Sequence, residues 1–444
     1  MSSTTLNIPT LDCAAAGAER QALRKAARAS FMGNFVEWFD YAAYGYLATI
    51  IAATFFPQAD KTSGLLATFA VFALSFLVRP LGGVVWGHLG DRHGRRNALS
   101  WSILIMSLST FCIGLLPGYA QIGLWAPCLL LVIRLVQGFS ASGEYAGAAA
   151  FLAEYAPAGR RGLYTSIVPA STAAGLLFGA AFVAALHELL SSQALHSWGW
   201  RLPFLLAAPF GLVGRYIRMN LQDTPKFLEM EQRLERKTGM TATPIGVLLT
   251  HHRRSLAIGL GVTCLNAVAF YLLLSYMPTY LSSEMGMSER DAFIASTVSL
   301  ATYIGLIFLM GRLSDQFGRK TMLVVASLLF LGFTVPLFKL LDGQPLLVIL
   351  AIQIIFGAML AMNDGTLPCL LAEIFPTAVR FSGFALSFNL ANALFGGTAP
   401  FIATWLIQAS GNKLAPAGYL LAAALVALVA LLMCKETAHS PLKD

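Results

Sequence analysis

Charged residues are scarce in this chain of 444 residues, because Asp, Glu, Lys and Arg together make up 12% and hydrophobic residues make up 57%. The mean hydropathy is +0.68. Such a composition leaves too few polar side chains to cover the surface of a water-soluble domain. It therefore excludes a soluble globular protein and indicates one that is embedded in a membrane.

Cysteine is scarce as well, and the six cysteines form no C-x-x-C pair. Most of them lie in apolar stretches, where cysteine serves as a small packing residue, so we expect neither a disulfide framework nor a metal site. The sequence also lacks a nucleophile motif, an H-E-x-x-H pair and a phosphate-binding loop. We therefore expect no enzymatic activity, no metal and no cofactor.

Long hydrophobic runs, in contrast, are abundant. A stretch of about 20 apolar residues is long enough for a helix to cross the hydrocarbon core of a bilayer. The first 30 residues have neither the apolar core nor the cleavage site of a signal peptide, so we expect the first span to act as the insertion signal and to remain. We predict an all-α membrane protein with twelve spans, at residues 31–55, 64–86, 98–116, 123–154, 163–190, 201–220, 254–282, 291–311, 321–341, 346–372, 381–410 and 414–434.

Three short patterns occur twice, in the same order and roughly 220 residues apart. They are G-x-L-x-D-x-x-G-R-[RK] at Gly87 and Gly311, A-E-x-x-P-x-x-x-R at Ala153 and Ala372, and an acidic residue before threonine at Asp223 and Glu436. Two parallel copies of one six-helix unit are therefore predicted, an arrangement in which secondary transporters place the substrate between the copies. The predicted organisation is an N-terminal arm (1–30), a first bundle (31–220), a central loop (221–253), a second bundle (254–434) and a tail (435–444).

Lysine and arginine give the chain a net charge of +8, and they are distributed unevenly. They concentrate in the N-terminal arm, in the predicted loop at 87–97 and in the central loop, whereas the loops on the other side of the membrane hold few. Because basic residues accumulate in cytoplasmic loops, we predict a multi-pass protein of the bacterial inner (cell) membrane with both termini in the cytoplasm. Topology thus accounts for the basic charge, and we expect no nucleic-acid partner.

The doubled G-x-L-x-D-x-x-G-R-[RK] pattern resembles the signature of the major facilitator superfamily, where it follows the second and the eighth helix. E-W-F-D at Glu37, R-P-L-G-G at Arg79 and Q-G-F-S-x-x-G-E-Y at Gln137 resemble its metabolite:proton symporter family. Within that family, the segments that begin at Ser109 and Tyr276 are most similar to the proline/glycine-betaine transporters.

This resemblance implies the major facilitator fold, with twelve transmembrane helices in two pseudo-symmetric six-helix bundles. It implies a proton-coupled symporter that imports a small polar metabolite by alternating access. The first candidate substrate is a zwitterionic osmolyte or amino acid, proline or glycine betaine, and the alternative is a carboxylic acid of the 2-oxoglutarate, citrate or shikimate type. The partners would be this substrate, protons and the lipid bilayer, and we expect the protein to act as a monomer.

Two other classes of membrane protein are less consistent with the sequence. A non-transporting sensor would need an appended signalling domain, and we expect none because both predicted terminal segments are short. An efflux antiporter of the superfamily would have a G-x-x-x-G-P-x-x-G-G stretch in the fifth helix, which the predicted span at 163–190 lacks.

Three ionisable residues in predicted spans are candidates for proton coupling, because burying a charge in a bilayer costs about 2.5–3.5 kcal/mol. Glu37 and Asp40 lie one helical turn apart in the first span, and Arg134 of the fourth span lies at a similar depth. One cavity could hold all three charges, in which the carboxylates disfavour each other's ionisation and the arginine favours it. The alternative is that Arg134 and one carboxylate form a permanent structural pair. By resemblance, the arginine of the fourth-helix signature takes part in proton coupling or substrate binding.

The candidate substrate contacts are polar and aromatic residues near the middle of spans from both halves. They are Tyr41, Tyr44, Arg134, Gln137, Asn266, Tyr271, Asn389 and Asn392. Together with Trp38, the tyrosines of the first span offer aromatic faces that attract a quaternary ammonium, while Arg134 or amides would bind a carboxylate. Ordinary helix packing is the alternative for each aromatic residue. A dicarboxylate would need a second basic residue at this depth, and Arg79, the other candidate, is better placed for a gate.

The repeated pattern is predicted to form a gate at the cytoplasmic edge. The gating candidates are Asp91, Arg95, Arg96 and Glu154 in the first half and Asp315, Arg319 and Glu373 in the second. The aspartate is expected to stabilise a neighbouring helix N-terminus and the basic residues to meet the glutamate, so that this side is held closed without contact to the substrate. Glu144 is expected either to stabilise a gate or to face a polar crevice. Asp364 is either functional or the acceptor of an interhelical or helix-end hydrogen bond.

Overall fold

The computed structural model describes residues 9–57, 61–235 and 244–443, and these residues form helices without a single strand. Ten helices within this part of the chain are long and apolar enough to cross a membrane. They correspond to ten of the predicted spans. The predicted first and sixth spans are also helical, but each carries charged side chains that lower its hydropathy, such as Glu37 and Asp40 in the first and Arg215 and Arg218 in the sixth.

The first six spans contain the helices of the N-terminal half, several of which are split into two segments. These helices are α1 (Pro9–Tyr46), α2 (Ala48–Phe55), α3 (Lys61–Leu77), α4 (Arg79–His93), α5 (Arg95–Leu115), α6 (Tyr119–Ile122), α7 (Trp125–Ala141), α8 (Glu144–Tyr155), α9 (Arg161–Thr165), α10 (Ile167–Leu189), α11 (Ser192–Ser197), η1 (Gly199–Arg201) and α12 (Leu202–Met219). Two short helices, α13 (Pro225–Glu235) and α14 (Pro244–His251), lie between the halves in the sequence.

The C-terminal half repeats this plan. Its helices are α15 (Arg253–Phe270), η2 (Tyr271–Tyr276), α16 (Met277–Ser283), α17 (Glu289–Phe317), α18 (Arg319–Lys339), α19 (Leu346–Asp364), α20 (Leu367–Ile374), η3 (Thr377–Val379), α21 (Arg380–Ala391), η4 (Asn392–Gly396), α22 (Ala399–Ser410) and α23 (Ala415–Met433). With the first half, they form two six-helix bundles, as predicted.

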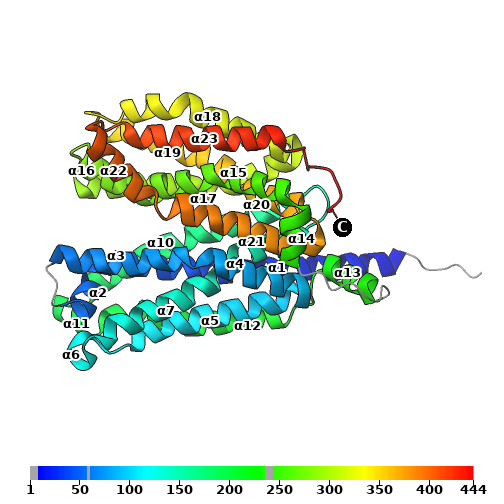
Figure 1. Ribbon diagram of the computed structural model, residues 1–444, viewed down its shortest axis with the longest axis horizontal. Coiled ribbons are helices and arrows are strands. Elements are labelled where there is room, and N and C mark those ends of the chain that lie inside the picture. Colours follow the sequence, from blue (N-terminus) through cyan, green and yellow to red (C-terminus); the bar gives the residue numbers. More distant parts are fainter. Residues whose placement is uncertain (1–8, 58–60, 236–243, 444) are drawn as a thin grey trace, which may run out of the picture.

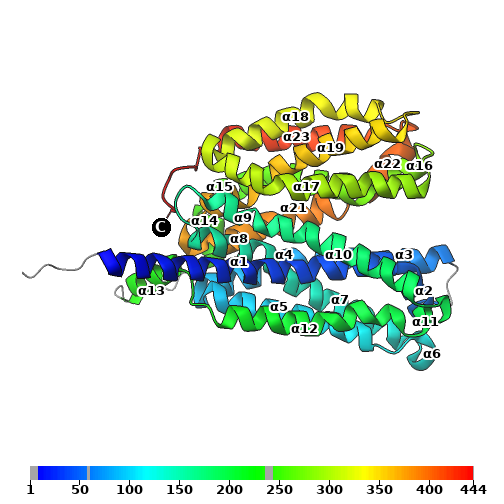
Figure 2. The same cartoon turned by 180° about the vertical axis from the view of Figure 1, so that it is seen from behind.

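The two halves lie side by side, with their long helices along one common direction (Figure 1). Within the first half, α1 packs along α10 and α5 along α12, and within the second half α15 packs along α23 and α17 along α19. The halves meet where α21 packs on α4 and where α17 packs on α9 and α10, a seam that is visible from behind in Figure 2. Polar side chains on these helices can therefore meet between the bundles.

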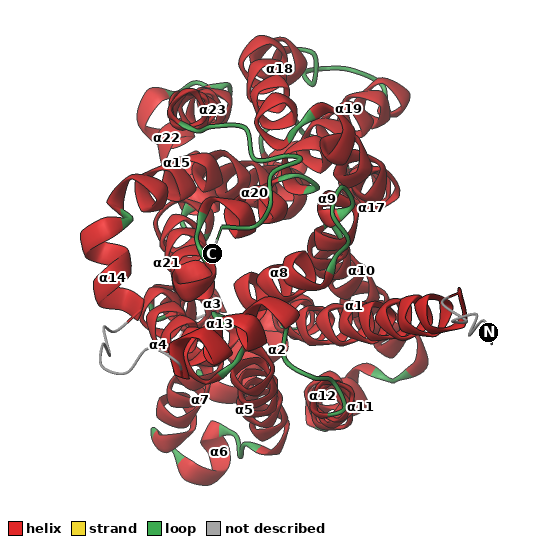
Figure 3. Cartoon of the chain, turned by 90° about the vertical axis from the view of Figure 1, so that its right-hand side faces the viewer, coloured by secondary structure: helices red, strands yellow, loops and turns green. Residues whose placement is uncertain are grey.

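Both ends of the described chain lie at the same end of the molecule, together with α13 and α14 (Figures 1 and 3). We call this the terminal end. An even number of crossings brings a chain back to the side from which it started, so this arrangement agrees with twelve crossings. Helix α1 begins at Pro9, well before the predicted start of the first span at residue 31.

The predicted loop at 87–97 is wrong. Helix α4 continues through the first repeated pattern to His93, and α17 continues through the second to Phe317. A single glycine then separates each helix from the next. Gly94 and Gly318 have φ angles of 95° and 101°, a backbone conformation that L side chains rarely adopt, so the pattern requires glycine at these turns.

Several spans are irregular. The second span is interrupted between α3 and α4, where Pro80 follows directly and lacks the N–H group that a continuous helix needs. The fourth and tenth spans are interrupted at the junctions of α7 with α8 and of α19 with α20. The seventh and eleventh contain the π-helical segments η2 and η4. Such irregularities are frequent at functional sites, because they turn side chains and backbone groups away from regular helix packing.

Candidate functional site

Glu37, a buried carboxylate of α1, forms an ion pair with Arg79. Arg79 Nη2 donates a hydrogen bond to Glu37 Oε1 at 2.5 Å, and it also contacts the hydroxyl of Tyr41. Glu37 is 2% exposed and Arg79 is 4% exposed. The break before Pro80 places Arg79 at the first position of α4, from which its side chain reaches α1.

Asp40 has a different partner. Arg134 Nη1 lies 2.7 Å from Asp40 Oδ2, and Gln137 Nε2 donates to the same oxygen at 2.6 Å. Gln137, one helical turn after Arg134 in α7, also accepts a hydrogen bond from Arg134 at 2.6 Å and donates to Thr110 Oγ1 at 2.8 Å. The guanidinium of Arg134 lies over the ring of Tyr44, with Cζ 3.7 Å from the ring centroid. The single cavity expected for Glu37, Asp40 and Arg134 is therefore divided into two ion pairs, and only Asp40 has Arg134 as its partner.

Several polar atoms around these two pairs are buried and have no hydrogen-bond partner among the described residues. They are Glu37 Oε2, Trp38 Nε1, Asp40 Oδ1, Arg79 Nε, Arg134 Nε, Arg134 Nη2 and Tyr271 OH. Buried polar groups in proteins are nearly always hydrogen-bonded. A concentration of free donors and acceptors between the bundles therefore has the chemistry to bind a polar ligand at both a positive and a negative end.

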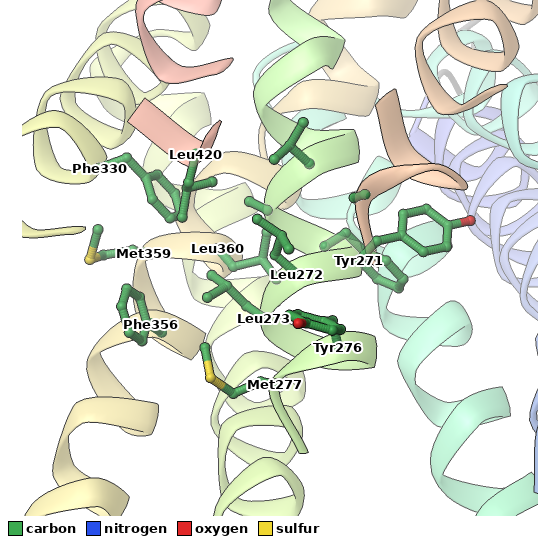
Figure 4. Close-up of a cluster of buried hydrophobic side chains, with 14 of the residues drawn as sticks. Tyr271, Leu272, Leu273, Tyr276, Met277, Phe330, Phe356, Met359, Leu360 and Leu420 are labelled. Carbon is green, nitrogen blue, oxygen red and sulfur yellow. The ribbon is translucent and has the colours of Figure 1, made fainter. Parts of the chain in front are cut away.

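The second half contributes Tyr271 to this region. Its ring centroid lies 6.0 Å from that of Phe76 and 6.5 Å from that of Trp38, both in the first half. In Figure 4, Tyr271 lies at the edge of a hydrophobic cluster and its hydroxyl points away from the other labelled side chains. Asn266 precedes it in α15, is buried, and lies close to the carboxylate of Asp364.

The asparagines of the eleventh span use their side chains for bonds to the backbone. Asn389 Nδ2 donates to the carbonyl of Ser142 in the first half at 2.8 Å and to its own helix. Asn392 Nδ2 donates to the carbonyl of Phe388 at 2.9 Å. Asn389 thus connects the two halves directly and uses both N–H groups of its amide, whereas Asn392 uses one.

The aspartates of the repeated pattern contact the opposite half. Asp91, in the last turn of α4, accepts two hydrogen bonds of 3.1 and 2.8 Å from backbone N–H groups in the first turn of α21. Asp315, in the last turn of α17, accepts two of 2.8 and 2.9 Å from the first turn of α9. A carboxylate is favoured at a helix N-terminus because the free N–H groups and the helix dipole are positive there. Both contacts lie at the terminal end and hold the two halves together.

A charge network surrounds Asp91. Arg95 Nη2 lies 3.1 Å from Asp91 Oδ1 and 3.4 Å from Glu154 Oε1. Glu154 is also paired at 2.5 Å with Arg380, which belongs to the second half. All of these side chains are buried.

The second copy of the pattern has the corresponding network. Arg319 lies 2.7 Å from Asp315 and 3.4 Å from Glu373, and Arg161 of the first half lies 3.4 Å from Glu373. Arg161 and Arg380 are absent from the predicted gating set. Both end a copy of A-E-x-x-P-x-x-x-R, so the repeat of that pattern is the signal that could have identified them.

Arg96 does not take part in the glutamate network. Its guanidinium donates to the carbonyl of Leu221 at 3.0 Å, and its backbone N–H and that of Arg95 donate to Asp223 at 3.3 and 3.1 Å. Asp223 therefore caps α5 within its own half, and burial raises its pKa above the ordinary value for aspartate. Glu436 caps α18 in the same way.

Two further buried acids have partners other than the two central arginines. Glu144 forms an ion pair with Arg218 of α12, inside the first half. Asp364 accepts hydrogen bonds from the hydroxyls of Tyr303 and, at 3.1 Å, of Tyr145 in the first half. Asp364 is thus the acceptor of interhelical hydrogen bonds, one of which crosses between the bundles.

The chain is similar to known transporters over almost its whole length. Residues 25–247 match the family described as "Sugar (and other) transporter", and residues 259–443 match the "Major Facilitator Superfamily". A glycine betaine/proline/ectoine/pipecolic acid transporter of Dickeya dadantii is 43% identical over 434 residues, which cover 95% of this chain and 85% of the relative. A proline/betaine transporter of Escherichia coli is 39% identical over 429 residues, with the same shares covered. Among solved structures, the proton:xylose symporter XylE bound to 6-bromo-6-deoxy-D-glucose matches with a TM-score of 0.79 and 18% identity, covering 96% of this chain and 98% of that one.

Proposed function

Because the chain belongs to the major facilitator superfamily and is 39–43% identical to relatives named as transporters of proline and betaine, we propose that it imports proline or glycine betaine together with protons. Transport between two bundles requires a site that each side of the membrane can reach in turn. The two ion pairs and the free polar atoms between the halves are the proposed location of that site.

The charge balance of this site carries the proposal for a zwitterionic substrate. Glu37 and Asp40 are each neutralised by one arginine, so the two pairs have no net charge. A zwitterion adds none, and the free nitrogens of Arg134 suit its carboxylate while the free oxygen of Glu37 suits its cation. A dicarboxylate would bring two negative charges into a buried site whose arginines are already paired, which is unfavourable.

For the proton, we propose Asp40 or Glu37 as the carrier, with Arg134 as the counter-charge of Asp40. Protonation of Asp40 would weaken its hold on Arg134, and the guanidinium would then be available to a substrate carboxylate. Ionisation of Asp40 would draw Arg134 back and release the substrate. Proton and substrate would thereby favour each other's binding, which is what symport requires.

We place the terminal end in the cytoplasm of a bacterial inner membrane, because lysine and arginine concentrate in the segments at that end. The contacts of Asp91 and Asp315 to the opposite half lie there as well. Hence the described state would be closed toward the cytoplasm, with the repeated pattern acting as the gate and the substrate bound elsewhere.

Uptake into proteoliposomes tests the proposal. Labelled proline, glycine betaine, 2-oxoglutarate and shikimate are supplied in turn, with an inwardly directed pH gradient imposed. We expect proline or glycine betaine to accumulate and a protonophore to abolish the accumulation. If only a carboxylic acid accumulates, the proposed substrate is wrong. If uptake does not depend on the pH gradient, transport is not coupled to protons.

A further inference from the structure

Four aromatic side chains of the central region form a closed ring. Trp38 and Tyr41 come from α1, Phe76 from α3 and Tyr271 from η2 of the second half. Successive ring centroids lie 5.5 Å apart for Trp38–Tyr41, 5.6 Å for Tyr41–Phe76, 6.0 Å for Phe76–Tyr271 and 6.5 Å for Tyr271–Trp38. Each ring therefore contacts two others of the set, and the four rings form a closed circuit of aromatic contacts that spans both halves.

The guanidinium of Arg79 already lies against two of these rings. Cζ of Arg79 is 4.3 Å from the ring centroid of Phe76 and 5.2 Å from that of Tyr41. Cations within about 6 Å of an aromatic centroid are attracted by the negative face of the ring, most strongly when water is excluded. Glu37, 2.5 Å from the same guanidinium, supplies the matching negative charge. The ring thus has the electrostatic properties of a cation-binding site.

We propose that this aromatic ring binds the cationic end of the substrate, that it favours a quaternary ammonium, and that Arg79 is its tethered occupant when substrate is absent. The inference rests on the proposed function, from which it takes a zwitterionic substrate. Two cations repel each other strongly in a buried site, so the ammonium displaces the guanidinium and takes over the charge of Glu37. A quaternary nitrogen has no N–H group to donate, which makes aromatic faces more suitable than hydrogen-bond acceptors.

The ring is complete only when the two halves are in contact. Three of its members belong to the first half, and Tyr271 is the one contribution from the second. The hydroxyl of Tyr271 has no partner among the described residues and points away from the hydrophobic cluster of its own half (Figure 4). If the bundles separate here, Tyr271 moves away from the other three rings. The ring therefore binds the ammonium when the two halves are in contact and binds it more weakly when they separate.

The ring is tested with glycine betaine and with its carbon isostere, 3,3-dimethylbutanoate, which has the same shape but no positive charge. Both are measured as competitors of labelled proline uptake in proteoliposomes, at proline concentrations well below its KM. The variants are Phe76→Leu and Tyr271→Leu, which keep an apolar side chain but remove an aromatic face. Tyr271→Phe is the matched control, because it keeps the face and loses only the hydroxyl.

We expect the leucine variants to weaken inhibition by glycine betaine about tenfold, as loss of a desolvated cation–π contact predicts, and to leave inhibition by the isostere nearly unchanged. Tyr271→Phe should preserve the ratio of the two inhibition constants, because it keeps the aromatic face, whatever loss of the hydroxyl does to both probes alike. Equal effects of the leucine variants on both probes, or no effect on either, would show that the ring only packs and would overturn the inference. Failure of the natural protein to take up either zwitterion would instead refute the proposed function.

Arg79 gives an independent test, measured as equilibrium binding of glycine betaine to the purified protein. Arg79→Gln removes the tethered cation and leaves Glu37 free, so glycine betaine should bind several-fold more tightly. Arg79→Lys keeps a cation and should leave the affinity close to that of the natural protein. Weaker or unchanged binding to the glutamine variant, with a native size-exclusion profile, would show that Arg79 does not compete for the ring.

Discussion

At the level of single residues, the buried carboxylates of this protein are nearly all paired with arginine. Among the described residues, Asp364 is the one buried acid without such a partner, and it accepts hydrogen bonds from two tyrosines instead. Removing one member of a buried pair leaves the other charge uncompensated and costs about 3–5 kcal/mol. The effect of neutralising a carboxylate at the central site therefore has to be compared with the effect of neutralising a carboxylate in another buried ion pair.

Neutralising the proton carrier, by Glu37→Gln or by Asp40→Asn, should abolish accumulation of substrate driven by a pH gradient. Exchange of labelled for unlabelled substrate between equal pools should survive, because exchange requires no net movement of protons. Arg134→Ala should reduce both activities, since it removes the counter-charge of Asp40 and the proposed partner of the substrate carboxylate. Uptake and exchange in the same proteoliposomes provide the measurement.

Glu144→Gln is the matched control, because Glu144 also belongs to a buried pair of the first half but has Arg218, which is outside the two central pairs, as its partner. It should lower the thermal stability without uncoupling transport from protons. Accumulation against a gradient in both the Glu37→Gln and the Asp40→Asn variants would move the coupling to another acid. If the control variant also loses proton coupling, the effect would follow from disturbing any buried ion pair and would not identify the proton carrier.

The sequence could identify these ionisable residues but not all of their partners. Glu37, Asp40 and Arg134 stand out because they interrupt apolar spans. That Arg79 pairs with Glu37 depends on the break before Pro80 and on how α4 is turned toward α1, and neither rotation nor proximity between helices is encoded in local periodicity. The same limit hides the partners of Glu144 and Asp364.

At the level of helices, the repeated pattern joins two crossings through one glycine. Gly94 adopts a φ of 95°, and Asp223 lies directly where a side chain on this residue would be. The apolar runs predicted the crossings but not where the helices end. The length of an apolar run reflects the thickness of the hydrocarbon core, and a helix can continue beyond that core. Helices α4 and α17 continue beyond it, stabilised by the polar contacts of their last turns.

Asp91→Asn should reduce transport about tenfold or more and change the equilibrium affinity for substrate little. The carboxylate binds two N–H groups of α21 only while the halves are joined at the terminal end, and charged hydrogen bonds of this kind contribute about 1.5–3 kcal/mol. Its loss would shift the balance between closed and open states. Uptake rate and ligand binding, compared in the same preparation, check this.

Asp315→Asn is the matching change in the second half and should have a similar effect, since Asp315 binds the first turn of α9 in the same way. Normal transport by both variants would exclude the repeated pattern from the transport cycle. A loss of substrate binding as large as the loss of transport would mean that the aspartates support the binding site and not the gate.

For the whole molecule, the doubled patterns and the family resemblance were sufficient to predict the fold, because pseudo-symmetry and apolar length are global properties of the sequence. They could not predict which residues of the two halves meet. Contacts such as Glu154 with Arg380 and Asn389 with the Ser142 carbonyl join residues more than 200 positions apart. They arise only after the two bundles have packed.

Reporter fusions test how this arrangement is oriented in the membrane. One reporter is placed after Asp444 and one near Glu231 in α13, a helix that lies at the terminal end of the molecule (Figure 3). We expect both to be active only as cytoplasmic reporters, because the basic segments of this end favour the cytoplasmic side. Removing basic residues from the segments near α1 and α13 should reduce this preference, since retention by positive charge is its physical cause. Periplasmic activity at one site alone would contradict an even number of crossings in the second half. Periplasmic activity at both sites would reverse the orientation, and the contacts of Asp91 and Asp315 would then close the periplasmic side.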